Sequence, residues 1–365
     1  MMGIYLNSKT AYILYKGETQ NPYFVDKSQM LEELFPLVSR GNSHICITRP
    51  RRFGKTVMAN MIAAYFSKGC DANDIFQNLA VAQSPEYDKY RNKFSVIHIS
   101  FNDIGEECIS YKQYIEQIRE CLVHDLKKEY PEAELYGKTD VAGILRYINA
   151  EEPTARFIFV LDEWDFIFHQ DFVTERDKKA YLQFLRNLLK DRPYVLLAYM
   201  TGILPIAKYS SGSELNMFLE YTMAAEEQYS QYFGFTEEEV DILFQKYCMY
   251  TEGPQNLTRE ELKNWYDGYY SKFGRRLYNP RSVVTSLKNN NLGNYWTSSG
   301  PYDEIYYYIE NNVDDVRDDL ALMVSGVAVP AKIKEYAATS MNLQTRDEIF
   351  SAMVVYGFLS YENGK

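Results

Sequence analysis

A short apolar run, a turn and a helical pattern follow one another at residues 45–66, and this order constrains the fold more than any other stretch. The run 45–47 predicts a buried strand, and Pro50 and Gly54 predict a turn after it. A helix is then predicted by apolar side chains at the spacing of one helix face, namely Met58, Met61, Ile62, Tyr65 and Phe66. The chain is therefore expected to pass from a central strand through a tight loop into a helix.

The loop ends in Gly54-Lys55-Thr56, which is the ending of a phosphate-binding P-loop. In such a loop the main-chain N–H groups surround a phosphate, a glycine allows close approach, and the helix N-terminus adds positive potential. Lys55 would reach the β- and γ-phosphates of ATP, and the Thr56 hydroxyl would bind Mg²⁺. The predicted nucleotide-binding residues are Pro50, Arg51, Arg52, Phe53, Gly54, Lys55, Thr56 and Val57.

One position departs from the P-loop consensus, which places a glycine five residues before Gly54. Arg49 occupies that position. Arg49, Arg51 and Arg52 could compensate by adding positive charge beside the phosphates. The alternative is a basic strand-to-helix turn that binds no nucleotide, so a second motif is needed to decide.

Two carboxylates, Asp162 and Glu163, follow directly after the apolar run 157–161. An uninterrupted apolar run of this length is typical of a strand buried on both faces of a parallel sheet. Sheets of this kind bind their ligands beyond the carboxyl ends of the strands. Asp162 is therefore predicted to hold Mg²⁺ and Glu163 to act as the general base toward water. The alternative is an ordinary acidic turn at a strand end.

The run 194–200 predicts a further strand, which ends at Thr201. In P-loop ATPases with a catalytic glutamate, a polar residue at this strand end senses the γ-phosphate. Thr201 is the candidate for that role, and the alternative is a threonine that merely ends a strand.

Strands at 45–47, 94–101, 157–161 and 194–201 alternate with helical patterns, which indicates a parallel sheet covered by helices on both faces. The predicted fold is the α/β fold of a P-loop NTPase, in its additional-strand, catalytic-glutamate class. Residues 229–235 are the candidate for a fifth strand.

We expect an ATPase core at 1–228 and a helical and winged-helix-like domain at 229–365. Capping boxes at 236–239 and 258–261 each predict the start of a helix in the second domain. The end of the chain, 346–359, predicts a helix followed by a short strand, as in part of a winged helix.

Asn279-Pro280 predicts another helix start, with Arg281 in its first turn. Arg281 could reach back to a γ-phosphate. The alternative, which the sequence favours, is a surface or capping arginine.

The composition is that of a globular protein, with 46% hydrophobic residues and a net charge of −11. An acidic chain argues against broad electrostatic attachment to nucleic acid or to anionic lipid. No apolar stretch approaches the length of a membrane span, so no membrane association is expected. The five cysteines are widely spaced and fit free thiols in a cytoplasmic protein.

The sequence resembles the AAA-ATPase-like family. The resemblance extends over nearly the whole chain in a specific order, through Tyr23-Phe24-Val25-Asp26-Lys27-Ser28, the loop at 49–56, Leu161-Asp162-Glu163-Trp164-Asp165, Thr201-Gly202-Ile203-Leu204-Pro205-Ile206, Phe233-Gly234-Phe235-Thr236, Trp265-Tyr266-Asp267-Gly268-Tyr269 and Tyr278-Asn279-Pro280-Arg281-Ser282. The family pattern tolerates the arginine at position 49. Typical members join this region to a C-terminal nuclease-like domain, and no nuclease motif is visible in this sequence.

These patterns lead to a Mg²⁺-dependent ATPase as the main hypothesis. The second hypothesis is a nucleotide-binding switch or scaffold without turnover, and the third is a DNA-associated module that works with a nuclease in defence or mobile-element biology. A nuclease or DNA partner is implied by the resemblance alone, and a homo-oligomer is possible because many P-loop ATPases take an arginine from a neighbour.

Overall fold

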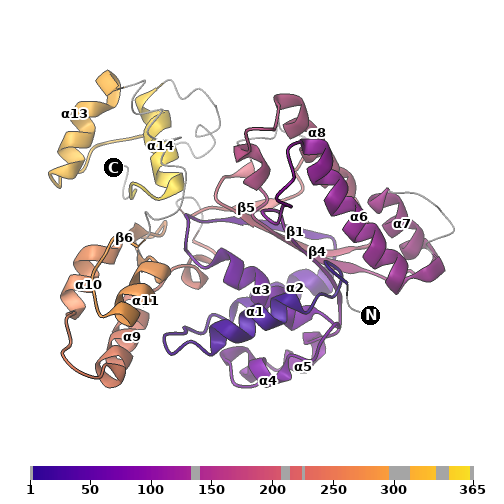
Figure 1. Cartoon of the computed structure of the whole chain (residues 1–365), viewed down its shortest axis with the longest axis horizontal. Coiled ribbons are helices and arrows are strands. Elements are labelled where there is room, and N and C mark those ends of the chain that lie inside the picture. The colour runs from indigo at the N-terminus through magenta and orange to yellow at the C-terminus, as the bar shows by residue number, and fades with distance from the viewer. Residues whose placement is uncertain are drawn as a thin grey trace. The chain divides into compact units, whose positions relative to one another are not determined.

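The computed structural model describes residues 3–132, 140–206, 214–223, 227–295, 313–333 and 345–361 (Figure 1). Their contacts divide the chain into two compact units. The first unit contains the described parts of 1–47, 55–202 and 210–220, and the second contains those of 48–54, 203–209 and 221–365. The division therefore falls inside the predicted phosphate-binding loop, between Gly54 and Lys55.

A five-stranded sheet forms the centre of the first unit, with the strand order β2-β3-β4-β1-β5. The strands are β1 (Ser43–Thr48), β2 (Ser95–Ser100), β3 (Phe157–Asp162), β4 (Val195–Gly202) and β5 (Leu219–Tyr221). β2, β3 and β4 run parallel, and Ser100 lies opposite Asp162. β4 lies between β1 and β3, so one strand separates the strand before the loop from the strand that ends in Asp162. This is the predicted α/β fold of a P-loop NTPase with an additional strand.

The predicted fifth strand at 229–235 is wrong. The fifth strand of the sheet is β5, and residues 230–232 form a 3₁₀ helix, η5 (Ser230–Tyr232). Tyr229 before it has a left-handed backbone with φ of 67°, which breaks an extended strand. Phe235 forms an isolated antiparallel bridge with Tyr278.

Helices cover both faces of the sheet, with α1 to α3 on one side and α6 to α8 on the other (Figure 1). The helices of the first unit are α1 (Thr10–Thr19), α2 (Met30–Arg40), α3 (Lys55–Phe66), α4 (Asn73–Phe76), η1 (Ala80–Gln83), α5 (Tyr87–Tyr90), α6 (Tyr111–Glu129), α7 (Val141–Glu151), η3 (Phe166–His169) and α8 (Glu175–Leu189). α3 is buried on almost every face because it packs against both α1 and β3. A helix that is apolar on nearly every side is expected to be buried in this way, and its first residue, Lys55, is buried with it.

The second unit is mainly helical, and the predicted domain bounds of 1–228 and 229–365 stay a prediction. Its elements are α9 (Glu237–Tyr250), α10 (Arg259–Tyr266), β6 (Asp267–Tyr270), β7 (Arg276–Tyr278), α11 (Pro280–Asn289), α13 (Val313–Val324) and α14 (Arg346–Tyr356). Capping boxes at Thr236 and Thr258 begin α9 and α10 as the sequence indicated. The antiparallel hairpin of β6 and β7 was not predicted.

The short strand expected at the end of 346–359 is wrong, although the helix before it is present as α14. Gly357 ends α14 with a left-handed backbone, φ of 82°. The main-chain N–H groups of Phe358 and Leu359 then bond back to the carbonyl oxygen of Met353 at 2.8 and 3.2 Å. These bonds complete a helix C-terminus and turn the chain away from an extended strand.

Gly202, at the end of β4, is required by close packing. A Cβ there would lie 2.4 Å from Asp165 Oδ1 and 2.6 Å from a ring carbon of Trp164, and Trp164 is fully buried. We expect Gly202→Ala to lower the free energy of unfolding by about 1–3 kcal/mol or more, because overpacked cores force side chains out of their rotamers. Thermal unfolding measured beside Gly17→Ala tests this, since a Cβ at Gly17 in α1 would meet nothing within 4 Å. Equal stability of the two variants would contradict the packing argument.

All five cysteines are described, and each is a free thiol. Among the described residues, no helix has the length and apolar character needed to cross a membrane.

Candidate functional site

The loop after β1 adopts backbone conformations suited to holding a phosphate. Gly54 and Arg52 both have left-handed conformations, with φ of 87° and 69°. Such a conformation is strained for arginine, and strain of this kind is found where a loop is shaped for function. Apart from Gly54 itself and its two neighbours in the chain, no atom of the described residues lies within 4 Å of the place where a Cβ of Gly54 would be. The main chain is therefore open to a close ligand at Gly54.

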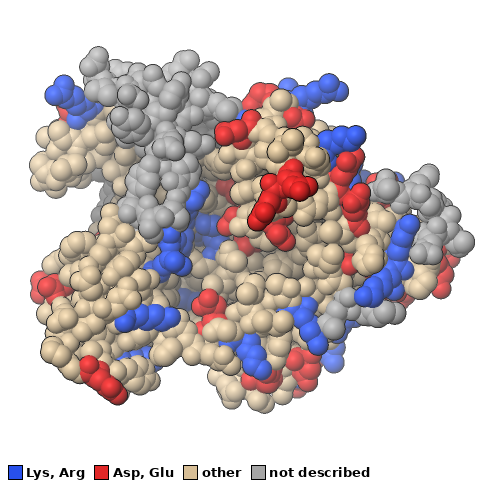
Figure 2. Space-filling view, viewed as in Figure 1, with Lys and Arg blue, Asp and Glu red and all other residues tan. Residues whose placement is uncertain are grey.

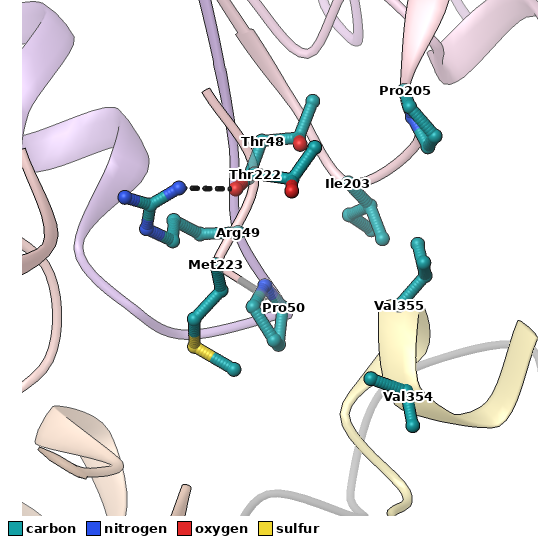
Figure 3. Close-up of a pocket in the computed structure, with 9 residues that line it drawn as sticks. All are labelled: Thr48, Arg49, Pro50, Ile203, Pro205, Thr222, Met223, Val354 and Val355. Carbon is teal, nitrogen blue, oxygen red and sulfur yellow. Dashed lines mark hydrogen bonds between the residues drawn. The ribbon is translucent and has the colours of Figure 1, made fainter. Parts of the chain in front are cut away.

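Arg49 does not lie beside that opening, so its expected role next to the phosphates is wrong. Its side chain is buried, and the guanidinium donates to the carbonyl oxygens of Thr48 and Tyr221 at 2.8 Å each. It also lies 5.1 Å from the ring centre of Phe233. Arg49 instead fastens the start of the loop to Tyr221, another segment of the second unit. Figure 3 shows its guanidinium on the opposite side of the main chain from Val354 and Val355.

The rest of the loop is also fixed by the second unit. The carbonyl oxygen of Phe53 accepts the N–H of Gly234 at 3.3 Å, and the Phe53 ring packs edge-on against Tyr269 at 4.8 Å. The carbonyl oxygen of Arg51 accepts the side-chain amide of Asn279 at 3.3 Å. These contacts set the conformation of the loop from segments far along the sequence.

Pro50 packs against the end of α14. A Cβ added at Gly357 would lie only 2.8 Å from the Cβ of Pro50. A narrow pocket lies beside this contact, lined by Thr48, Arg49, Pro50, Ile203, Pro205, Thr222, Met223, Val354 and Val355 (Figure 3). Its volume of about 20 Å³ suits a single water and excludes a nucleotide. The pocket therefore belongs to the packing behind the loop.

In the first unit, the fold brings Lys55 and Thr56 close to Asp162. Lys55 begins α3 and is buried, whereas Thr56 beside it is exposed. Both Thr56 and Lys55 act on the Asp162 carboxyl, since hydrogen bonding to Thr56 and the charge of Lys55 each lower its pKa. The two motifs, 107 residues apart in the sequence, thus lie at one edge of the sheet.

Asp162 itself is almost fully buried at the end of β3. Burial is the largest influence on its carboxyl and raises the pKa to about 6, against the opposing effects of Thr56 and Lys55. Oδ1 accepts the N–H of Glu163 at 3.0 Å, while Oδ2 is buried and has no hydrogen-bond partner of ordinary geometry among the described residues. An oxygen that has lost water without gaining a protein donor is suited to a cation or to a cation's water.

Glu163 follows with an unusual backbone. Its φ of 51° lies in the left-handed region, which costs a residue with a side chain of this size about 1 kcal/mol or more. Its carbonyl oxygen accepts the N–H of Phe166 at 3.0 Å, which begins η3, and its side chain is half-buried. This turn places the carboxylates of Asp162 and Glu163 at the end of β3. The first is almost fully buried and the second is half-buried.

Thr201 is fully buried near the end of β4. Its hydroxyl donates to the carbonyl oxygen of Ile47 in β1 at 2.8 Å, and its own carbonyl oxygen accepts the N–H of Trp164 at 3.2 Å. Its one hydroxyl hydrogen therefore joins β4 to β1. Contact of Thr201 with a terminal phosphate stays a prediction and would require this bond to rearrange.

The buried Asp162 carboxylate should destabilise the ligand-free protein. Below about pH 3 the carboxyl is protonated in both folded and unfolded chains, because both pKa values, 3.8 and about 6, lie above that pH. As pH rises to about 6 only the unfolded chain ionises, so the free energy of unfolding falls, by up to about 3 kcal/mol for a shift from 3.8 to about 6. We expect Asp162→Asn to unfold at a higher temperature than wild type at pH 7.5 and at a similar temperature at pH 4.

Differential scanning calorimetry at both pH values, with the exposed Asp171→Asn as a matched control, checks this prediction. An Asp162→Asn variant less stable than wild type at pH 7.5 would contradict it.

The sequence did not predict the residues of the second unit that contact the loop at 49–53 and fix its conformation. Tyr221, Gly234 and Gly357 carry no pattern that would reveal this, because they act through main-chain atoms or close approach. Asn279 did give a signal as a helix cap, and its second contact with Arg51 depends on tertiary structure alone.

Comparison with known proteins agrees with this geometry. Residues 16–211 match the profile of the AAA-ATPase-like family, described as "Predicted AAA-ATPase". The chain is also similar to an uncharacterized protein encoded in the vnfD 5' region of Azotobacter chroococcum mcd 1, at 26% identity over 289 residues. That alignment covers 78% of this chain and 52% of the relative, so the chain spans about half the length of the curated relative it matches. Because the family profile covers more than half of the chain and includes the loop, both carboxylates and Thr201, the chain belongs to the AAA-ATPase-like family.

Proposed function

We propose that this protein binds ATP with Mg²⁺ at the Gly54-Lys55-Thr56 loop and hydrolyses it. One observation carries the proposal: a buried carboxylate, Asp162, lies beside the first residues of α3, and its Oδ2 has no hydrogen-bond partner of ordinary geometry among the described residues. In most structural carboxylates the buried oxygens are bonded to donors, because unpaired buried polar atoms are costly. A site built to receive a cation and phosphates explains the arrangement.

Each residue has a role in this proposal. The main-chain N–H groups around Gly54 and the N-terminus of α3 would hold the phosphates, with Lys55 reaching the β- and γ-phosphates. Glu163 would take a proton from the attacking water, since its carboxylate is next to Asp162 and less enclosed. Phosphoryl transfer of this kind depends on positioning and charge stabilisation more than on covalent chemistry.

Mg²⁺ fits the donor set of Thr56 and Asp162. Mg²⁺ is usually bound by one or two protein oxygens, with water and phosphates completing its shell. Among the described residues no group of three or more His, Cys, Asp or Glu side chains could hold a metal. When bound, Mg²⁺ would neutralise charge that develops on the phosphates.

Isothermal titration calorimetry with a non-hydrolysable ATP analogue, with and without Mg²⁺, tests binding. Phosphate release from ATP, measured with Mg²⁺ and with excess chelator, tests turnover. We expect Mg²⁺-dependent binding and release. Absence of binding at millimolar nucleotide in the presence of Mg²⁺ would refute the proposal.

A nucleotide-driven switch without turnover is the second candidate, and the anchoring of residues 48–54 favours it. The loop is bonded to several segments of the second unit, so a bound nucleotide would bias that unit directly. A single-turnover measurement separates the two candidates, because a pure switch would retain intact ATP.

Location and partners remain part of the proposal. We place the protein in the cytoplasm because none of its five cysteines is paired. Assembly into a homo-oligomer, or action beside DNA or a nuclease, is suggested by the family resemblance alone.

A further inference from the structure

The residue that follows the proposed base, Trp164, has its main chain held by two other elements of the first unit. Its N–H donates to the carbonyl oxygen of Thr201 in β4 at 3.2 Å. Its carbonyl oxygen accepts the hydroxyl of Tyr181, from the middle of α8, at 2.8 Å. Trp164 is fully buried, and buried main-chain groups need such partners. The two bonds therefore fix the segment that follows Glu163.

Tyr181 is held firmly in the position from which it donates. Figure 2 shows charged side chains of both signs on the surface in the area of α8, whereas the buried face of this helix is mainly apolar and includes the fully buried Tyr181. The Tyr181 ring packs edge-on against Phe101 at 5.5 Å and against Phe168 at 5.7 Å. Burial raises the pKa of Tyr181 well above its ordinary value, so the hydroxyl keeps the one hydrogen that it donates to Trp164.

Glu163 needs this support because its own backbone is strained. Its φ of 51° lies in the left-handed region, and a conformation of this kind persists only where the surrounding structure over-determines it. Before the turn, the carbonyl oxygen of Asp162 accepts the N–H of Phe101 at 2.9 Å. After the turn, Gly202 gives Trp164 room to pack, since a Cβ there would lie 2.6 Å from a ring carbon of Trp164. The backbone conformation that directs the Glu163 side chain is therefore set by its neighbours.

We propose that Tyr181 is a positioning residue, whose hydroxyl acts through Trp164 to hold the Glu163 carboxylate where it takes a proton from the attacking water. This inference rests on the proposed function, in which Glu163 is the base. A base works only within hydrogen-bond reach of the proton that it takes, and a displacement of about 1 Å can slow a reaction about 100-fold. Because Tyr181 acts through the main chain after Glu163, it contributes to turnover and not to nucleotide binding.

Tyr181→Phe removes the hydroxyl and keeps the packed ring. We expect kcat for ATP hydrolysis to fall about tenfold or more. The Kd for a non-hydrolysable ATP analogue with Mg²⁺, measured by titration calorimetry, should change by less than about twofold. A fall in kcat without a change in Kd is the result that a purely structural role would not give.

Tyr194→Phe is the matched control. Tyr194 is also fully buried, and its hydroxyl donates to the carbonyl oxygen of Leu188 at 2.5 Å. It lies directly before β4, at the opposite end of that strand from Thr201. Each variant loses one buried hydrogen bond, so both should unfold at a lower temperature than wild type. Well below that temperature, Tyr194→Phe should retain the kcat of wild type.

A double-mutant cycle tests whether Tyr181 acts through Glu163. The base is absent in Glu163→Gln, so adding Tyr181→Phe to that variant should change the single-turnover rate by less than about twofold. A further loss of about tenfold in the double variant would show an effect that does not pass through Glu163, and it would overturn the proposal.

The remaining outcomes separate this inference from the function beneath it. Wild-type kcat in Tyr181→Phe, or an equal fall of kcat in Tyr194→Phe, overturns the positioning role while ATP hydrolysis stands. Loss of affinity for the ATP analogue in Tyr181→Phe also overturns it, because the residue would then support binding. A wild type that binds ATP and does not hydrolyse it overturns the proposed hydrolysis, and the positioning role with it.

Discussion

Glu163→Gln should bind Mg²⁺ and ATP as wild type does and hydrolyse ATP about 100-fold more slowly or worse. A general base contributes about 10²–10⁴ to a rate, and glutamine keeps the shape of the side chain while losing its basicity. The strained backbone at Glu163 should survive the change because the two side chains are nearly isosteric.

Pre-steady-state phosphate release and calorimetric titration with the same protein give the two quantities needed. The exposed Glu151→Gln in the last turn of α7 serves as the control and should match wild type in both. If Glu163→Gln retains the wild-type hydrolysis rate, the base lies elsewhere. If it loses binding as well, the residue has a structural role.

Lys55→Ala should lose nucleotide affinity by about 30-fold or more. Truncating one member of a buried, charge-bearing contact costs about 2–5 kcal/mol, and Lys55 is only 8% exposed. Removing its charge also takes away an influence that lowers the pKa of Asp162, so that carboxyl should bind Mg²⁺ less well near pH 6.

A titration with the ATP analogue at pH 7.5, beside the exposed Lys112→Ala, measures the effect. Lys55→Met keeps the apolar stem and separates loss of charge from loss of packing. Wild-type affinity in Lys55→Met would show that the lysine does not contact the phosphates.

Much of this architecture could be predicted because strands buried on both faces leave a strong mark in the sequence. Residues 157–162 are apolar until Asp162, and all six are buried in β3. The position of Asp162 relative to Lys55 followed from the rule that parallel strands bring their carboxyl ends to one edge. The order of the strands and helices along the chain was enough to predict that Asp162 and Lys55 lie at the same edge of the sheet.

The predictions that proved wrong depended on backbone conformation or on distant contacts. Tyr229 and Gly357 have left-handed backbones that interrupt two expected strands, and tyrosine in particular gives no hint of this. Arg49 was assigned to the phosphates because of its position in the motif. Its burial beside Tyr221 depends on a partner 172 residues away, which sequence spacing does not reveal.

The boundary between the two units crosses the chain at the peptide bond from Gly54 to Lys55. Gly54 and Lys55, which are both proposed to hold phosphate, therefore belong to different units. By thermodynamic linkage, if nucleotide binding at this loop changes the affinity of the second unit for a ligand, that ligand changes the affinity for nucleotide by the same factor.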